Sequence, residues 1–480
     1  MIPVKRMKIR IVPTVERVIP KFLNFSNPDR IGPIVGYIRS LDGKTVEAQL
    51  GQALSEFKSR HIDFEGVLLT NYRKIEQHLP DKNLSMPQKL LIGAYFTHEY
   101  AVEAAALFNP SIVSHPDQSN LKDGELRFIL SLRATGEGHI SSIEFKTGVI
   151  GPDGAIHPHQ SATKLSTGKR VEAQQYSKDF VISRAECSGA AEAMMQRALP
   201  ERFTLQEALA IISQIEADTN LSLQAAKEKI SDVYSLNYEL YFDKDIPISS
   251  RVIFPSSSSE SNGMEDARFV RFQHEDQILY LGTYTAYNGR AIRPQLVETK
   301  DFRHFRIRPF YGKAASDKGM ALFPEKIKGK YAMVGRQGGR CLSIMYSDSL
   351  HFWQEYKLLQ APQRAWELLQ IGNCGSPLKT PYGWLLLTHA VGPMRKYVLS
   401  FTLLDLHDPE IVLATLDDPF LSPNEEEREG YVPHVLYSCG LIQHRENLII
   451  PYAMSDSSIS FAQVELEEVI NELMKSKVVG

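Results

Sequence analysis

The sequence predicts an all-β fold, a β-propeller that carries an N-terminal extension over residues 1–105 and a helical insertion at about 150–245. The first observation is that residues from about 250 to 465 contain only short apolar runs separated by turns. The second is a crude repeat, because Lys300–Phe305 resembles Ser347–Phe352 and each follows one apolar strand and precedes another. Strand-rich units that recur every ~40 to 60 residues are typical of propeller blades, so each turn is predicted to connect two blades. This pattern alone also fits a pair of β-sandwiches.

The N-terminal extension is predicted to be mostly helical. Lys8–Val12 has the pattern of a short strand that ends at Pro13. Val46–Lys58 has the spacing of an amphipathic helix, and Met86–Phe108 is rich in Ala and Leu and begins with a proline in its first turn. Such helices pack against a neighbour or a second subunit, so we expect a homo-oligomer formed through them.

The chain changes character at Asn109. Leu126–Arg133 and Ile140–Phe145 are short β-type runs separated by two glycines, which predicts a hairpin. Two helical segments, Ala185–Ala198 and Thr204–Tyr234, then interrupt the strands. The insertion is therefore predicted to contain a helical hairpin.

Composition excludes several classes of function. The chain has 480 residues, 43% hydrophobic and 23% charged, which is typical of an ordinary globular protein. A formal net charge of -3 gives no reason to expect nucleic acid or an anionic membrane as partner. No cationic segment followed by an apolar run opens the sequence, and no run approaches the ~18 apolar residues of a membrane span, so a cytoplasmic location is expected.

Metal ligands and disulfides are not predicted. The four cysteines lie far apart with no CxxC spacing, which favours free and mostly buried thiols: Cys187, Cys341, Cys374 and Cys439. His157 and His159 could ligate a metal, but no third ligand lies near them in the sequence.

The most promising stretch for chemistry is Asn262–Arg268, which lies between a serine-rich loop and an apolar strand. Its two carboxylates, Glu265 and Asp266, and the guanidinium of Arg268 fall at the mouth of a predicted strand pair. Adjacent carboxylates beside a fixed guanidinium can hold one acid ionised and leave the other as a proton donor. Taken alone, the stretch also fits a solvated turn with an ordinary ion pair.

Further polar stretches place four potential cations near strand ends: Lys318, Arg336, Lys379 and His389. If these side chains converge, they form an anion site, because guanidinium and ammonium groups suit phosphate oxygens. Taken singly, each is more typical of a solvated surface residue. The three tryptophans, Trp353, Trp366 and Trp384, could stack on a sugar, although core positions are more usual for this residue in a β-rich protein.

The ordered set of these motifs resembles glycoside hydrolase family 130, the β-mannoside phosphorylases and related β-1,2-mannosidases. Six motifs carry the resemblance over about 200 residues: Glu265–Arg268, Leu322–Lys326, Gly372–Thr380, Leu403–Pro409, Gly430–Val435 and Tyr452–Asp456. Upstream, Asn109-Pro110-Ser111 followed by Arg133 is similar to the substrate contacts of the family's first blade. The resemblance implies a five-bladed β-propeller catalytic domain over residues 106–470.

The resemblance also implies roles for individual residues. Asp266 matches the general acid, which is thought to pass its proton to the glycosidic oxygen through a hydroxyl of the mannosyl residue. Asn109, Ser111, Arg133 and Asp456 match positions that bind mannose, with Glu265, Arg268 and His434 as further substrate contacts. Lys318, Arg336, Lys379 and His389 match the basic set around phosphate. The expected reaction is inverting phosphorolysis of a β-linked manno-oligosaccharide, with inorganic phosphate as co-substrate and no cofactor.

Departures from the family pattern leave two alternatives open. Ala267 replaces the usual proline, Lys318 stands where arginine is common, His434 replaces an asparagine, and Ser455-Asp456-Ser457 varies Ala-Asp-Thr. A hydrolase would need a second carboxylate to activate water, and the candidates are Glu325, Glu367, Glu425–Glu427 and Glu429. A non-catalytic carbohydrate-binding propeller is the remaining alternative.

Overall fold

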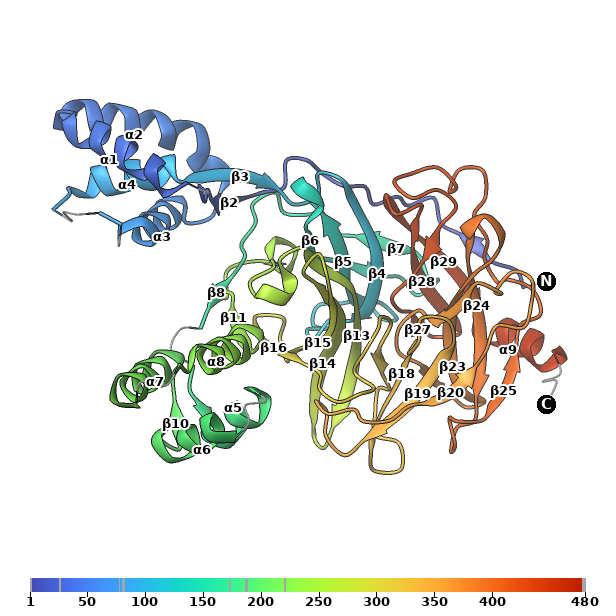
Figure 1. Cartoon of the computed structure of the whole chain (residues 1–480). Coiled ribbons are helices and arrows are strands. Elements are labelled where there is room, and N and C mark those ends of the chain that lie inside the picture. The colour runs from blue at the N-terminus through green and yellow to red at the C-terminus, as the bar shows by residue number, and fades with distance from the viewer. Residues whose placement is uncertain are drawn as a thin grey trace.

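The structure is a computed structural model that describes residues 2–25, 27–76, 78–79, 83–171, 174–185, 189–219 and 222–476. It is mostly β, with two groups of helices outside the sheets. Figure 1 shows the sheets side by side, the N-terminal helices to their upper left and the helices of the insertion to their lower left. No helix in the described ranges is both long and apolar enough to cross a membrane. Cys187 lies outside the described residues.

Antiparallel strands form five consecutive groups along the chain. The first is β4 (Ala106–Ser114), β5 (Leu126–Thr135), β6 (Ser141–Ile150), β7 (Ile156–Pro158) and β12 (Val252–Ile253), and the second is β13 (Gly263–His274), β14 (Gln277–Tyr287), β15 (Ile292–Thr299) and β16 (His304–Pro309). The third is β17 (Ala321–Leu322), β18 (Tyr331–Gly335), β19 (Leu342–Ser347) and β20 (Lys357–Gln360). The fourth is β21 (Gln370–Asn373), β22 (Leu378–Thr380), β23 (Gly383–Val391), β24 (Tyr397–Leu404) and β25 (Val412–Thr415). The fifth is β26 (Leu436–Tyr437), β27 (Ile442–His444), β28 (Asn447–Met454) and β29 (Ser458–Glu465), followed by helix α9 (Leu466–Lys475).

The first two groups join into one 11-stranded sheet through a single parallel pairing of Gly263 with Ser141. Gly263 has φ 133°, and a Cβ atom there would lie 2.7 Å from the Ser141 backbone nitrogen, so only glycine allows this approach. The same sheet is extended by β11 (Tyr238–Tyr241) and β8 (Lys169–Arg170). The strand that carries Asp266 therefore starts against the β5–β6 hairpin.

The repeated turns do not connect sheets, so the prediction that each connects two blades is wrong. Lys300–Phe305 contains the turn between β15 and β16, and Ser347–Phe352 contains the turn between β19 and β20. Each joins two neighbouring strands of one sheet. The repeat therefore marks an equivalent position in two groups, the turn between the third and the fourth strand.

The N-terminal region contains four helices: α1 (Ile31–Ser40), α2 (Gly43–Phe57), α3 (Phe64–Glu76) and α4 (Met86–Tyr95). The predicted helix Met86–Phe108 is too long, because α4 ends at Tyr95 and Thr97–Ala101 forms β3, which pairs with β2 (Val18–Phe22). Aromatic and β-branched residues after Phe96 gain a strand partner here, which overrides helical propensity.

The first residues of the chain complete the last sheet and are not part of the helical extension. β1 (Lys5–Arg6) pairs antiparallel with β29. The backbone nitrogens of Met7 and Ile11 donate to the carbonyls of Phe461 and Ile459. The strand predicted at Lys8–Val12 is reduced to one isolated bridge at Ile11.

The insertion carries four helices: α5 (Lys178–Ala185), α6 (Gly189–Ala198), α7 (Leu205–Thr219) and α8 (Gln224–Leu236), with the short strands β9 (Tyr176–Ser177) and β10 (Arg202–Phe203). The segment Thr204–Tyr234 is therefore two helices. They enclose their own apolar cluster, which includes Val181, Ile212 and Ile230. Two of the three tryptophans, Trp353 and Trp384, are fully buried in the sheets, so they are core residues.

Glu260 fixes the serine-rich loop in front of β13. Its carboxylate is fully buried and accepts hydrogen bonds from the hydroxyls of Tyr238 and Tyr284 and from the backbone nitrogens of Ser256 and Ser257. We expect Glu260→Ala to lower the free energy of unfolding by ~3 to 5 kcal/mol, because three buried donors and a partly buried one lose their acceptor. Urea unfolding measures this, with Tyr284→Phe as a control expected to lose only ~1 kcal/mol. Equal losses of stability for the two variants would contradict the role of Glu260 as the shared acceptor of these hydrogen bonds.

Candidate active site

Asp266 and Asn109 meet at two β-bulges, one in the first strand of each joined group. The ladder of β13 is interrupted between Glu265 and Arg268, and that of β4 between Phe108 and Ser111. Both residues are left-handed, with φ 54° for Asp266 and 50° for Asn109, a conformation that Asn and Asp tolerate better than other side chains. The bulges turn the two side chains together, and Asn109 Nδ2 donates to Asp266 Oδ1 at 2.7 Å.

Arg133, from the neighbouring strand β5, contacts both carboxylates of the β13 bulge. Its guanidinium lies 2.9 Å from Glu265 Oε1 and 3.4 Å from Asp266 Oδ1. Lys318 Nζ lies 2.6 Å from Glu265 Oε2. Glu265 is thus held between two cations, whereas Asp266 shares one of them.

Arg268 lies beneath this pair as a structural cation. Its side chain is 2% exposed and donates to the Asp266 carbonyl oxygen and to the Tyr437 hydroxyl, each at 2.8 Å. Its Nε is buried without a partner in the described part of the chain. Arg268 therefore holds the backbone of the bulge and adds positive charge under Asp266.

Asp266 and Asp456 have opposite pKa shifts. Burial raises the pKa of Asp266, but the charges of Arg133 and Arg268 and the Asn109 hydrogen bond outweigh it and hold the pKa below its usual value. Burial, followed by the negative charge of Asp266, raises the pKa of Asp456 to about 7, against the opposing charge of Arg133. At pH values below about 7 the two carboxyl groups therefore hold one proton, and it resides on Asp456.

The raised pKa of Asp456 predicts a pH-dependent stability. The folded pKa of about 7 lies above the unfolded value of ~4, so the folded protein binds the extra proton and stability falls as the pH rises through this window. Asp456→Asn removes the loss. We expect the variant to gain roughly 2 kcal/mol more over the wild type at pH 8 than at pH 5, measured by urea unfolding. A gain that is the same at both pH values would contradict the shift.

Arg336 and His389 lie next to the loop that carries Lys318. A Cβ atom on Gly319 would lie 3.8 Å from Arg336 Cβ, and Arg336 NH1 lies 3.3 Å from His389 Nε2. Burial, with the charges of Arg336 and Arg268, lowers the pKa of His389 well below its usual value. His389 is therefore neutral near pH 7, so it does not supply the fourth positive charge expected from the sequence. It can instead accept a hydrogen bond that orients Arg336.

Three predicted site residues are not brought into this group. Lys379 Nζ pairs with Glu325 at 2.5 Å, and both side chains are well exposed, 50% and 39%. Ser111 Oγ accepts from the Phe269 backbone nitrogen at 3.0 Å, which makes it a link between β4 and β13. His434 is left-handed and exposed, with no side-chain contact recorded in the described residues.

The carboxylates proposed for a hydrolase are engaged elsewhere or exposed. Glu367 is buried and accepts from the backbone nitrogens of Gln363 and Arg364, where it closes a turn. Glu427 is buried and accepts from the Tyr452 hydroxyl at 2.7 Å. Glu425, Glu426 and Glu429 are exposed. None of them contacts Asp266 in the described structure.

Sequence reasoning missed several residues of the site. Tyr437 binds Arg268, and Arg395 adds positive charge near Asp456, but neither lies in a charged or glycine-rich motif. Asn373 lies within the Gly372–Thr380 motif, where its neighbours give no sign of a role in binding. Its Oδ1 and that of Asn109 are buried without a partner in the described residues. Buried orphan acceptors beside a carboxylate and cations suggest a ligand with hydroxyl groups.

Three comparisons place the chain among known proteins. A family model described as β-1,4-mannooligosaccharide phosphorylase matches residues 241–475. A 1,2-β-oligomannan phosphorylase from Thermoanaerobacter sp. (strain X514) is 34% identical over 230 residues, which cover 47% of this chain and 74% of the relative. The chain belongs to glycoside hydrolase family 130. A β-1,2-mannobiose phosphorylase from the same strain is 31% identical over 261 residues, 52% of this chain and 83% of the relative. The solved complex of β-1,2-mannobiose phosphorylase from Listeria innocua with β-1,2-mannobiose is 20% identical, covers 78% of this chain and 94% of that one, and has a TM-score of 0.46.

The family 130 match begins at residue 241, after the last helix of the insertion. Helices α1–α8 therefore lie outside it, as do β4 and β5 with Asn109 and Arg133. The matched part carries Asp266, Lys318 and Arg336. The site is thus assembled from the matched segment together with two strands that precede it.

Proposed function

We propose that this protein catalyses the inverting phosphorolysis of β-linked manno-oligosaccharides and releases α-mannose 1-phosphate. The observation that carries the proposal is a partly buried acid, Asp266, beside Glu265, which pairs with Lys318 on the loop that lies against Arg336. The relatives named above are phosphorylases of mannosides, which supports the same class of substrate here.

We propose further that the five strand groups are the blades of a five-bladed propeller over residues 106–470. The single pairing of Gly263 with Ser141 joins two antiparallel groups where the first strand of one begins beside the third strand of the other, as a contact between adjacent blades would. Pairing of β1 with β29 supports closure, because it gives the last blade an outer strand from the other end of the chain. The helices of residues 1–105 and 150–245 are then additions to the ring.

In the proposed reaction, phosphate attacks C1 of the mannosyl residue from the face opposite the leaving sugar. A phosphate oxygen forms a bond to C1 as the C1–O glycosidic bond breaks, and the leaving oxygen receives the proton of Asp266 through a hydroxyl of the mannosyl residue. Arg336 and Lys318 hold the attacking anion, so no second carboxylate is needed. Asn109 and Arg133 orient Asp266 and contact the mannosyl hydroxyls, and Asp456 holds a proton close by.

The test is to incubate the purified chain with β-1,2- and β-1,4-linked mannobiose, each with and without inorganic phosphate. Both linkages are needed because the family description and the relatives differ in this respect. Release of mannose 1-phosphate that depends strictly on phosphate supports the proposal. Release of free mannose without phosphate would assign a hydrolase, and binding without turnover would assign a carbohydrate-binding protein.

A further inference from the structure

A second polar cleft, of about 390 Å³, lies where α5 and α8 approach the second sheet. Arg184 of α5, Arg293 of β15 and Tyr311 after β16 contribute to its wall. β15 begins opposite the end of β14, which in turn pairs with the first residue of β13, so the cleft lies at the same end of the sheet as Asp266. The chain leaves the cleft through residues 312–317 and then reaches Lys318.

Positive charge gathers in this cleft, and Asp232 is the one carboxylate among the described residues of its lining. The Arg184 guanidinium lies 4.8 Å from the centre of the Tyr311 ring, and the charges of Arg184 and Arg293 both act on the Tyr311 hydroxyl. Arg308 and Arg184 both act on the half-buried His351 next to it. In the described ranges, none of these three arginines forms an ion pair, and Arg184 Nε is buried without a hydrogen-bond partner.

The pKa of His351 is affected by the same positive charges. Burial, followed by the charges of Arg308 and Arg184, lowers the pKa of His351 to about 4. Its Nδ1 is buried without a partner in the described structure. A lone anion in the cleft would relieve the repulsion between these cations.

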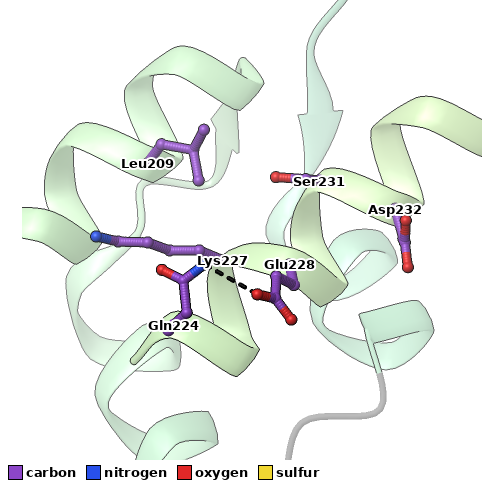
Figure 2. Close-up of a pocket in the computed structure, with 6 residues that line it drawn as sticks. All are labelled: Leu209, Gln224, Lys227, Glu228, Ser231 and Asp232. Carbon is purple, nitrogen blue, oxygen red and sulfur yellow. Dashed lines mark hydrogen bonds between the residues drawn. The ribbon is translucent and has the colours of Figure 1, made fainter. Parts of the chain in front are cut away.

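In a neighbouring hollow on α8, by contrast, Lys227 and Gln224 each pair with a carboxylate. Figure 2 shows that hollow, lined by Leu209 of α7 and by residues of α8 that include Lys227. There Lys227 forms an ion pair with Glu216, and Gln224 donates to Glu228 at 2.9 Å. Asp232 lines both hollows, and it is the one carboxylate among the described residues of the polar cleft.

We propose that the polar cleft between α5, α8 and the second sheet is a binding site for a phosphate group, carried by a small phosphate ester. Two guanidinium groups offer paired N–H donors that match the oxygens of a phosphate, and the Tyr311 hydroxyl offers one more donor. The volume exceeds what a free phosphate fills and lies in the range of small-molecule sites, ~300 to 1,000 Å³. Ile292 and Phe310 add apolar surface for the rest of the ester. This site is separate from the residues proposed to hold the attacking phosphate.

Equilibrium dialysis of the full chain with labelled inorganic phosphate tests the proposal. We expect two phosphates per wild-type chain and one in Arg184→Gln/Arg293→Gln, with affinity at the cleft reduced by on the order of 100-fold. Arg197→Gln, an exposed charge on α6 of the same insertion, is the matched control and keeps both. Arg336→Gln should keep the phosphate in the cleft. If the wild-type chain binds only one phosphate, and only the double variant loses it, the cleft site is supported and the proposed active-site phosphate is not.

Asp232→Asn keeps the test decisive if the double variant does not fold. Removing the one described carboxylate of the cleft is expected to tighten phosphate binding there by ~3-fold or more. In competition, α-mannose 1-phosphate should displace phosphate from the cleft of Arg336→Gln, and mannose should not. Unchanged binding in both the double variant and Asp232→Asn would overturn the site. If neither α-mannose 1-phosphate nor mannose displaced phosphate, the proposal of an ester ligand would be wrong and the cleft would bind free phosphate.

Discussion

Asp266→Asn is expected to lower kcat for phosphorolysis of an unactivated β-mannobiose by about 10² to 10⁴-fold, with little change in KM. Asparagine keeps the shape of the side chain and can still accept from Asn109 Nδ2, but it has no proton to give. A mannoside with a good leaving group needs little protonation, so the variant should recover most activity on it. Steady-state kinetics on both substrates checks this.

The matched control for this variant is Asp276→Asn. Asp276 is exposed in the turn between β13 and β14, at the opposite end of the strand from Asp266. We expect its kinetic constants to equal those of the wild type. Full activity of Asp266→Asn on the unactivated substrate would remove Asp266 from the acid role.

Arg336→Gln is expected to raise KM for phosphate by on the order of 100-fold and to change KM for the mannoside little. Arg336 lies against Gly319 and His389, where a phosphate beside Lys318 would meet its guanidinium. Initial rates at varied phosphate and fixed mannoside measure the effect.

Lys379→Gln is the matched control for the proposed phosphate site. The sequence motif predicts Lys379 as a phosphate ligand, but in the structure it pairs with Glu325 at the surface. We therefore expect this variant to keep the wild-type KM for phosphate. If Lys379→Gln raised that KM as much as Arg336→Gln, the separation of the two lysines in the structure would be contradicted.

The lowered pKa of Asp266 has a consequence for the order of events in the proposed reaction. A general acid must be protonated, yet the charges of Arg133 and Arg268 hold the pKa of Asp266 below its usual value, although Glu265 pairs with Arg133 and Lys318. A phosphate dianion beside Lys318 and Arg336 offsets part of that charge and raises the pKa of Asp266. We propose Asp456, whose pKa is raised to about 7, as the source of that proton.

The sequence predicts the strand content and the central motif because both are local signals. Alternation of apolar residues and a turn-forming glycine pair mark β5 and β6, and the Glu265–Arg268 stretch is continuous in the chain. The helix predicted at Met86–Phe108 was too long because the pairing of β3 with β2 is a contact between residues about 80 apart in the sequence, which no local pattern contains.

The candidate site shows the same limit. Asn109, Arg133 and Asp266 come together only because two bulges in separate strands face one another. Lys318 and Lys379 look alike as sequence motifs, yet one reaches Glu265 and the other reaches the surface. The neutral state of His389 follows from its burial beside Arg336 and Arg268, a three-dimensional property of the fold.

The identity and anomeric configuration of the first sugar product test the central claim most directly. Proton and phosphorus NMR can follow β-mannobiose in phosphate buffer from the first turnover. We expect α-mannose 1-phosphate as the initial product, with no sugar released when phosphate is absent. Free mannose formed without phosphate, or a β-configured mannose 1-phosphate, would contradict it.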